Sequence, residues 1–279
     1  MTELLIDVPT LHRLLSERPD GVRVIDCRSQ LQDTDWGRRQ YLAGHIPGAV
    51  HAHLEQDLSG PIIRGTTGRH PLPEPATLAG TFRQWGIGPN TRVIAYDDAG
   101  GVYASRLWWL LRWLGHDHCQ LLDGGLPAWL AAGFPLRSGD ETVPAQAFIG
   151  VLQAGHTVDA QTLLARAPEQ VLIDVRGPAR YAGREEPIDP IAGHIPGAIN
   201  LPFTGNLAAD GRFLPAEALR ARYAAVGNQA VSYCGSGVTA CHAIFAMALA
   251  GLPPARLYPG SWSEWITDPA RPIAVGEQP

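Results

Sequence analysis

The sequence predicts an α/β protein of two tandem domains, each a parallel sheet with helices on both faces. Short β-rich runs alternate along the chain with amphipathic or apolar stretches, most of which end in glycine, as in parallel sheets covered by helices. The second half also repeats motifs of the first half in the same order. The repeat spans roughly 140 residues, which is the size of one domain rather than of a solenoid unit.

The predicted strands are short and rich in β-branched residues, as expected of strands buried in a parallel sheet. They are VRVIDC (22–27), RVIAYD (92–97), VLIDVR (171–176) and QAVSYC (229–234). The predicted helices are TLHRLLSE (10–17), TLAGTFRQWG (77–86), ASRLWWLLRWLG (104–115) and TACHAIFAMALAG (239–251). In sheets of this kind, ligands bind at the carboxyl ends of the strands.

The repeat sets the predicted domain boundaries. AGHIPGA occurs at 43–49 and recurs unchanged at 192–198, while VIDCRSQ (24–30) corresponds to LIDVRGP (172–178). The stretch between the two copies lacks helical periodicity, so it is expected to connect them. The chain is therefore predicted to consist of a domain over 1–140, a linker over 141–157 and a domain over 158–279.

Composition excludes several classes of function. The net charge of −5 favours neither nucleic acid nor an anionic membrane surface, and Arg112 interrupts the longest apolar run (107–115). The N-terminal stretch has no basic region followed by a small-residue cleavage site, so a cytoplasmic protein without a secretory signal is expected. The four cysteines form no C-x-x-C pair, so we expect neither a disulfide framework nor a metal site, and no cofactor.

The stretch VSYCGSGVTAC (231–241) contains the best candidate for a reactive residue. Cys234 stands where a strand ends and a helix begins, followed by Gly235 and Gly237. The glycines let successive backbone N–H groups point inward as an anion-binding nest, and the helix N-terminus adds partial positive charge. A thiolate is stabilised in such a place and becomes a nucleophile.

Cys234 allows four interpretations. A buried cysteine at a strand end is often only a packing residue. A cysteine phosphatase needs an arginine six positions after the cysteine, where this chain has Ala240. Sulfur transfer needs no such arginine, because the thiolate carries the sulfur as a persulfide. A non-catalytic sulfur carrier would use the same residue. The backbone N–H groups expected to hold the persulfide sulfur are those of Gly235, Ser236, Gly237, Val238 and Thr239.

The chain resembles the two-domain sulfurtransferases of the rhodanese superfamily over essentially its whole length. The resemblance rests on GHIPGA in both halves, DVR before the second copy, CGSGVTAC, and YPGSWSEW near the end. It implies a persulfide on Cys234 and a catalytically inactive first domain. The counterpart of Cys234 in the first half is Asp97, which agrees with this because an aspartate does not carry sulfur.

The loop CGSGVT resembles that of the 3-mercaptopyruvate sulfurtransferases. Thiosulfate sulfurtransferases tend to have basic residues after the cysteine, where this chain has Gly235 and Ser236. The resemblance thus implies 3-mercaptopyruvate as the sulfur donor, with thiosulfate as the alternative. The acceptor would be a thiol, such as that of thioredoxin or glutathione, or cyanide.

Further site residues follow from the resemblance. Arg180 in PARYAG matches the family arginine that binds the donor's anionic group. The mercaptopyruvate enzymes have a second arginine shortly after it, in a PEPR-like stretch. This chain reads GREEPIDP there, with Ile188 or Asp189 near the expected place and Arg184 as a substitute out of register.

The mercaptopyruvate enzymes also share a serine–histidine–acid relay. Ser236 matches the serine, and His70, in RHPLP, matches the histidine. The resemblance places the acid in HLEQD, as Glu55 or Asp57. Because His70 comes from the first half of the chain and Ser236 from the second, their pairing would bring the two halves together at the site.

Overall fold

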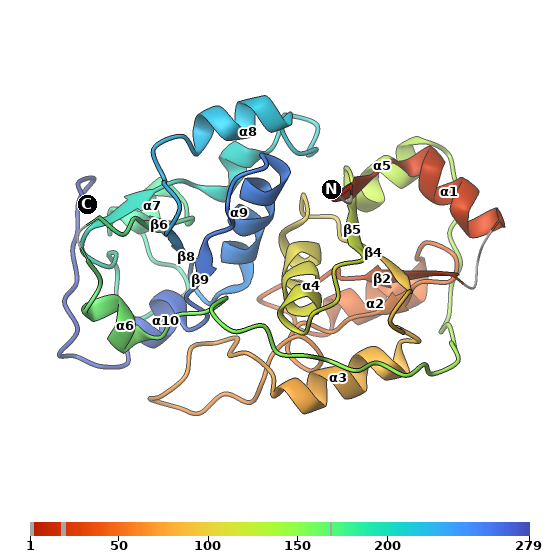
Figure 1. The fold of residues 1–279 in the computed structure, drawn as a ribbon, viewed down its shortest axis with the longest axis horizontal. Coiled ribbons are helices and arrows are strands. Elements are labelled where there is room, and N and C mark those ends of the chain that lie inside the picture. Colours follow the sequence, from red (N-terminus) through yellow and green to blue (C-terminus); the bar gives the residue numbers. More distant parts are fainter. Residues whose placement is uncertain (1–2, 18–20, 168) are drawn as a thin grey trace. The chain divides into compact units, whose positions relative to one another are not determined.

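The computed structural model describes residues 3–17, 21–167 and 169–279, and the chain forms two compact units (Figure 1). The first unit comprises Met1–Gly60, Pro73–Gln153 and Ala209–Phe213, and the second comprises Pro61–Leu72, Ala154–Ala208 and Leu214–Pro279. The segment Pro61–Leu72 therefore belongs to the second unit, although it lies in the first half of the sequence.

The first unit contains a five-stranded parallel sheet with the strand order β1-β5-β4-β2-β3. Its strands are β1 (Leu5–Ile6), β2 (Val22–Asp26), β3 (Val50–His51), β4 (Arg92–Tyr96) and β5 (Cys119–Leu122). Its helices are α1 (Val8–Glu17), α2 (Trp36–Ala43), α3 (Pro75–Gln84), α4 (Val102–Trp113) and α5 (Gly125–Ala131). Helices α1 and α5 share one core with the sheet, and Figure 1 shows α4 on the other side of β4 and β5.

The second unit contains a four-stranded parallel sheet with the order β7-β6-β8-β9. Its strands are β6 (Leu172–Asp174), β7 (Ala198–Asn200), β8 (Val231–Tyr233) and β9 (Arg256–Leu257). Its helices are α6 (Ala160–Leu164), α7 (Pro178–Tyr181), α8 (Ala216–Arg222), α9 (Val238–Leu249), α10 (Ser261–Trp265) and the 3₁₀ helix η2 (Phe203–Asn206).

Strand β8 shows why both faces of this second sheet are covered. Val231 and Tyr233 point into a core that includes α6 and α10, whereas the hydroxyl of Ser232 between them donates to the carbonyl of Ala240 in α9 at 3.2 Å. Alternate residues of one strand thus face opposite helical layers. The predicted α/β class, with parallel sheets covered on both faces, is confirmed.

The repeated motifs build the same local structure in both units. Arg176 binds Asp174 through Nε and Nη2, the latter at 2.6 Å, and also donates to the carbonyl of Gly193, the first residue of the GHIPGA motif, at 2.7 Å. Arg28 binds Asp26 and the carbonyl of Gly44 in the same way. A buried arginine therefore ties each GHIPGA turn to the end of a central strand, which is a structural role.

The expected connecting segment packs along the first unit. Residues 141–153 contain neither helix nor strand. Within it, the backbone N–H of Gln146 donates to the carbonyl of Arg83, and that of Val151 donates to the carbonyl of Leu114. In the part of the chain that the structure describes, no helix combines the length and apolar character needed to cross a bilayer.

Candidate active site

Cys234 occupies the loop that joins β8 to α9. The strand ends at Tyr233 and the helix begins at Val238, so the loop is four residues long. Gly237 caps the helix in a left-handed conformation with φ of +82°. A Cβ at Gly237 would lie 2.3 Å from the carbonyl oxygen of Pro259, so this position requires glycine both for its backbone angles and for space.

Backbone and hydroxyl groups hold the cysteine in place. The N–H of Gly237 donates to the Cys234 Sγ at 3.2 Å, and the Cys234 N–H donates to the Ser261 Oγ at 3.1 Å. Cys234 is only 3% exposed. An N–H directed at sulfur next to a helix N-terminus is the arrangement that stabilises a thiolate.

A second loop, at the start of α10, supports the cysteine loop. The N–H of Trp262 donates to the Cys234 carbonyl at 3.0 Å, and that of Ser263 to the Gly235 carbonyl at 2.9 Å. Among the residues that the structure describes, Ser261 is the only one other than glycine with a positive φ, +52°. Backbone strain of this kind is typical of functional sites. The motif YPGSWSEW contributed to the family resemblance, which implied no role for Ser261.

In the first unit, the backbone N–H groups of the equivalent loop bind the side chain of Asp97. The hydroxyl oxygens of Tyr96 and Tyr233 accept the N–H of Ile46 and Ile195, each within a GHIPGA motif, so the following residues, Asp97 and Cys234, are equivalent. The Asp97 carboxylate accepts four backbone N–H groups at 2.8 to 2.9 Å, those of Ala99, Gly101, Tyr103 and Ala104. Burial raises the pKa of Asp97, and these hydrogen bonds oppose the rise. The strand-to-helix loop therefore encloses an anionic side chain in the first unit.

His70 and Ser236 lie together in the structure. The His70 Nδ1 is 2.7 Å from the Ser236 Oγ, and both side chains are buried. His70 reaches the serine because its segment, Pro61–Leu72, packs with the second unit. Both predicted acids lie in the first unit, where the structure pairs them with His53: the Asp57 carboxylate accepts the His53 N–H at 2.7 Å, and the Glu55 carboxylate lies 3.2 Å from the His53 Nδ1.

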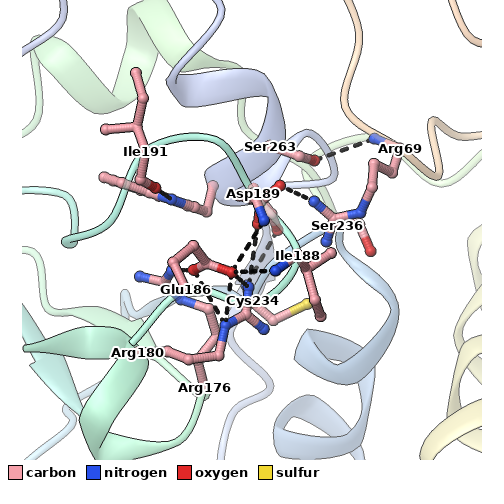
Figure 2. Close-up of polar contacts among 12 residues, drawn as sticks. Arg69, Arg176, Arg180, Glu186, Ile188, Asp189, Ile191, Cys234, Ser236 and Ser263 are labelled. Carbon is pink, nitrogen blue, oxygen red and sulfur yellow. Dashed lines mark hydrogen bonds and ion pairs between the residues drawn. The ribbon is translucent and has the colours of Figure 1, made fainter. Parts of the chain in front are cut away.

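Arg180 also faces the cysteine loop. Its Nη1 and Nη2 lie 3.6 and 3.5 Å from the position that a Cβ would take on Gly235. Its guanidinium binds the Glu186 carboxylate, with Nη2 at 2.6 Å, and the Asp189 carboxylate at 3.1 Å (Figure 2). The first predicted arginine is thus beside the cysteine loop, held by two carboxylates.

The sequence reasoning missed Arg69. Its Nη2 lies 2.8 Å from the Cβ position of Gly235, its Nη1 forms an ion pair with Asp189, and its backbone N–H donates to the Ser263 Oγ at 3.1 Å (Figure 2). Burial lowers the pKa of Arg69, and the nearby Cys234 opposes this shift. The available signal was its position directly before His70.

Arg184 is not part of this cluster. Gly183, with φ of +73°, turns the chain after α7, and the Arg184 side chain forms an ion pair with Glu277 at 2.7 Å. The two side chains are 57% and 73% exposed. The predicted donor-binding arginine thus lies on the surface of the second unit, because its register directs it away from Gly235.

Replacing Arg184 by alanine is expected to change the kcat/KM for the sulfur donor by less than about twofold, because exposed ion pairs contribute little. Steady-state sulfide release with a thiol acceptor measures this. A tenfold loss of kcat/KM would show that Arg184 does bind the donor.

The comparisons with known proteins agree with this geometry. The model of the rhodanese-like domain matches twice, over residues 8–132 and 158–268. The chain belongs to the rhodanese-like sulfurtransferase family. Both matches fall on the repeated halves, so the duplicated motifs mark duplicated rhodanese-like domains, and the predicted family is confirmed.

Several members of the rhodanese-like family are similar to the chain over nearly its whole length. A probable 3-mercaptopyruvate sulfurtransferase of Pseudomonas aeruginosa is 51% identical over 281 residues, covering 98% of each chain. A putative thiosulfate sulfurtransferase of Mycobacterium tuberculosis is 43% identical over 265 residues, covering 92% of each. Among solved structures, a 3-mercaptopyruvate sulfurtransferase from Leishmania major matches with a TM-score of 0.83 and 32% identity, covering 94% of this chain and 74% of that one.

Proposed function

We propose that this chain transfers sulfur from 3-mercaptopyruvate through a persulfide on Cys234 to a thiol or cyanide. The observation that carries the proposal is the loop itself. A buried cysteine with an N–H on its sulfur occupies the position at which the first unit holds a carboxylate in four backbone N–H groups. A persulfide anion needs the same kind of stabilisation.

In the first half-reaction, the Cys234 thiolate attacks the donor's sulfur. A bond forms between Sγ and that sulfur, and the bond from sulfur to C3 of the donor breaks. The electron pair passes to C3, giving the enolate of pyruvate. The donor's thiol proton is delivered to C3, so pyruvate leaves and the persulfide anion remains. The backbone N–H groups of residues 235–239 stabilise that anion.

Ser236 and His70 move this proton. They are 2.7 Å apart and buried, which is hydrogen-bonding distance for a serine hydroxyl and an imidazole. Ser236 is two residues after Cys234 in the same loop, and in this scheme the enolate forms beside its hydroxyl. The histidine passes the proton through that hydroxyl and stabilises the charge that appears during transfer.

Arg180 binds the donor's carboxylate in this scheme. A guanidinium forms charge-assisted hydrogen bonds with a carboxylate. The Nε and Nη2 of Arg180 bind Glu186 and Asp189, and its Nη1 lies next to Gly235, where it would meet the donor. In the second half-reaction, an acceptor thiolate or cyanide attacks the outer sulfur, and Cys234 leaves as thiolate. Thioredoxin, glutathione and cyanide are the acceptors we propose, in a cytoplasmic setting.

A comparison of two donors tests the proposal. We expect the kcat/KM for 3-mercaptopyruvate to exceed that for thiosulfate by about tenfold or more, because the carboxylates of Glu186 and Asp189 compensate the arginines beside the loop. The relative from Mycobacterium tuberculosis makes thiosulfate the specific alternative. A tenfold preference for thiosulfate would overturn the donor assignment while leaving the persulfide mechanism intact.

A further inference from the structure

Two arginines from distant parts of the chain meet at Gly235. Arg180 comes from α7 and Arg69 from the segment Pro61–Leu72, and each has a guanidinium nitrogen within 3.6 Å of the Cβ position of Gly235. One carboxylate links them, because Asp189 pairs with Nη1 of Arg69 through one oxygen and with Nη2 of Arg180 through the other (Figure 2).

The charges in this cluster balance. Arg69, Arg180 and Arg176 bring three positive charges, and Asp189, Glu186 and Asp174, the partner of Arg176, bring three negative charges. The side chains of Glu186 and Asp189 are 4% and 3% exposed, so water screens them little. An incoming donor therefore meets guanidinium groups that are well placed but largely neutralised.

We propose that Arg69 is the second donor-binding cation and that Asp189 sets the preference for a donor with one negative charge over a donor with two. This inference rests on the proposed function and adds two residues to it. Arg69 takes the place beside the cysteine loop that Arg184 does not occupy.

The geometry of Arg69 agrees with a binding role. Nη1 is used in the ion pair with Asp189, while Nη2 faces Gly235, directly beside the nucleophile. The donor's carboxylate competes with Asp189 for the guanidinium when it arrives. A guanidinium holds its proton even where burial lowers its pKa, so Arg69 stays a cation throughout.

The ion pair with Asp189 is not the sole contact that holds the described segment Pro61–Leu72 in the second unit. The backbone N–H of Arg69 already donates to the Ser263 Oγ, and the next residue, His70, is hydrogen-bonded to Ser236. In this proposal the Arg69 side chain exchanges Asp189 for the donor's carboxylate while these other contacts keep the segment in place.

Monoanionic and dianionic donors respond differently to Asp189. With both carboxylates present, the cluster has no net charge. A second negative charge on the donor therefore gains little electrostatic attraction, although it still loses its hydration. Removing the charge of Asp189 leaves one uncompensated guanidinium. The added attraction is larger for the dianion thiosulfate than for the monoanion 3-mercaptopyruvate.

The test compares Arg69→Met and Asp189→Asn with the wild type, using 3-mercaptopyruvate and thiosulfate as donors and dithiothreitol, which is uncharged, as acceptor. Arg69→Met is expected to raise the KM for 3-mercaptopyruvate about tenfold or more, because a charge-assisted contact is lost. Asp189→Asn is expected to raise the ratio of kcat/KM for thiosulfate to that for 3-mercaptopyruvate about fivefold or more.

A second readout separates binding from structure. The persulfide is preloaded with sodium tetrasulfide, and its discharge to dithiothreitol is followed in a single turnover. Arg69→Met is expected to leave this rate within about twofold, because the donor is absent from that step. Arg39→Met is the matched control, since Arg39 forms an exposed ion pair with Asp33 in the first unit, and it should leave the KM and the donor ratio unchanged.

Three results would overturn the proposal. They are an unchanged KM in Arg69→Met, an equal fall in donor turnover and persulfide discharge in that variant, and an unchanged donor ratio in Asp189→Asn. The asparagine has the size of the aspartate, so the last result is available even if Arg69→Met folds poorly. Absence of persulfide in the wild type with both donors would instead refute the proposed function.

Discussion

Serine in place of Cys234 is expected to lower sulfur transfer about a thousandfold or more with either donor, as the loss of other catalytic nucleophiles does. Serine has nearly the size of cysteine and keeps a hydrogen-bonding atom for the Gly237 N–H, so the loop is retained. Its hydroxyl stays protonated at neutral pH and forms no bond to sulfur. Steady-state sulfide release from each donor measures the effect.

Cys119→Ala is the control for this variant. Cys119 lies in β5 of the first unit, and burial raises the pKa of its thiol, so it is inert. We expect this variant to keep most of the wild-type kcat/KM. More than a tenth of wild-type activity remaining in Cys234→Ser would mean that another group carries the sulfur.

Gly237→Ala is the second change with a large expected effect. The substitution places an L-residue at φ of +82° and a Cβ 2.3 Å from the Pro259 carbonyl oxygen, which is a backbone atom. Strain and overpacking together are expected to lower the free energy of unfolding by about 2 to 5 kcal/mol. The displaced N–H no longer reaches Cys234, so we expect kcat to fall about a hundredfold, the effect of losing one anion-stabilising donor.

Gly155→Ala separates strain from the contact with Pro259. Gly155 also has φ of +82°, but nothing lies within 4 Å of its Cβ position. This variant should lose only about 1 kcal/mol of stability and no activity. Urea unfolding and donor kinetics on both variants decide the matter. Equal losses of stability and activity in the two variants would show that the close approach of residue 237 to Pro259 does not matter for function.

Local patterns predicted the central strands and the longest helices closely, but not short elements such as β1, α7 and α10. The apolar stretches expected as helices over 104–115 and 239–251 are α4 (Val102–Trp113) and α9 (Val238–Leu249), because long runs of strong helix formers that end in glycine leave few alternatives. The central strands, too, fall within their predicted runs. The repeat made Asp97 the counterpart of Cys234, and the tyrosine contacts agree with that alignment.

Local sequence patterns do not predict ion pairs between residues that are far apart in the chain. Arg69 and Asp189 are 120 positions apart, and neither stands in a periodic segment. Nothing local in the sequence shows that Pro61–Leu72 packs with the second unit, since that choice depends on tertiary contacts such as the one between His70 and Ser236. The resemblance offered Arg184 only as a substitute out of register, and the local sequence does not show which way the turn after α7 directs its side chain.

The central claim is that Cys234 carries the transferred sulfur, and peptide mass spectrometry after incubation with 3-mercaptopyruvate tests it most directly. The excess donor is removed and the protein is digested without reductant. We predict an addition of about 32 Da, one sulfur atom, on the peptide that contains Cys234, and its absence from Cys234→Ser. A folded wild-type protein without this addition, or with the sulfur on Cys27, Cys119 or Cys241, would contradict the mechanism.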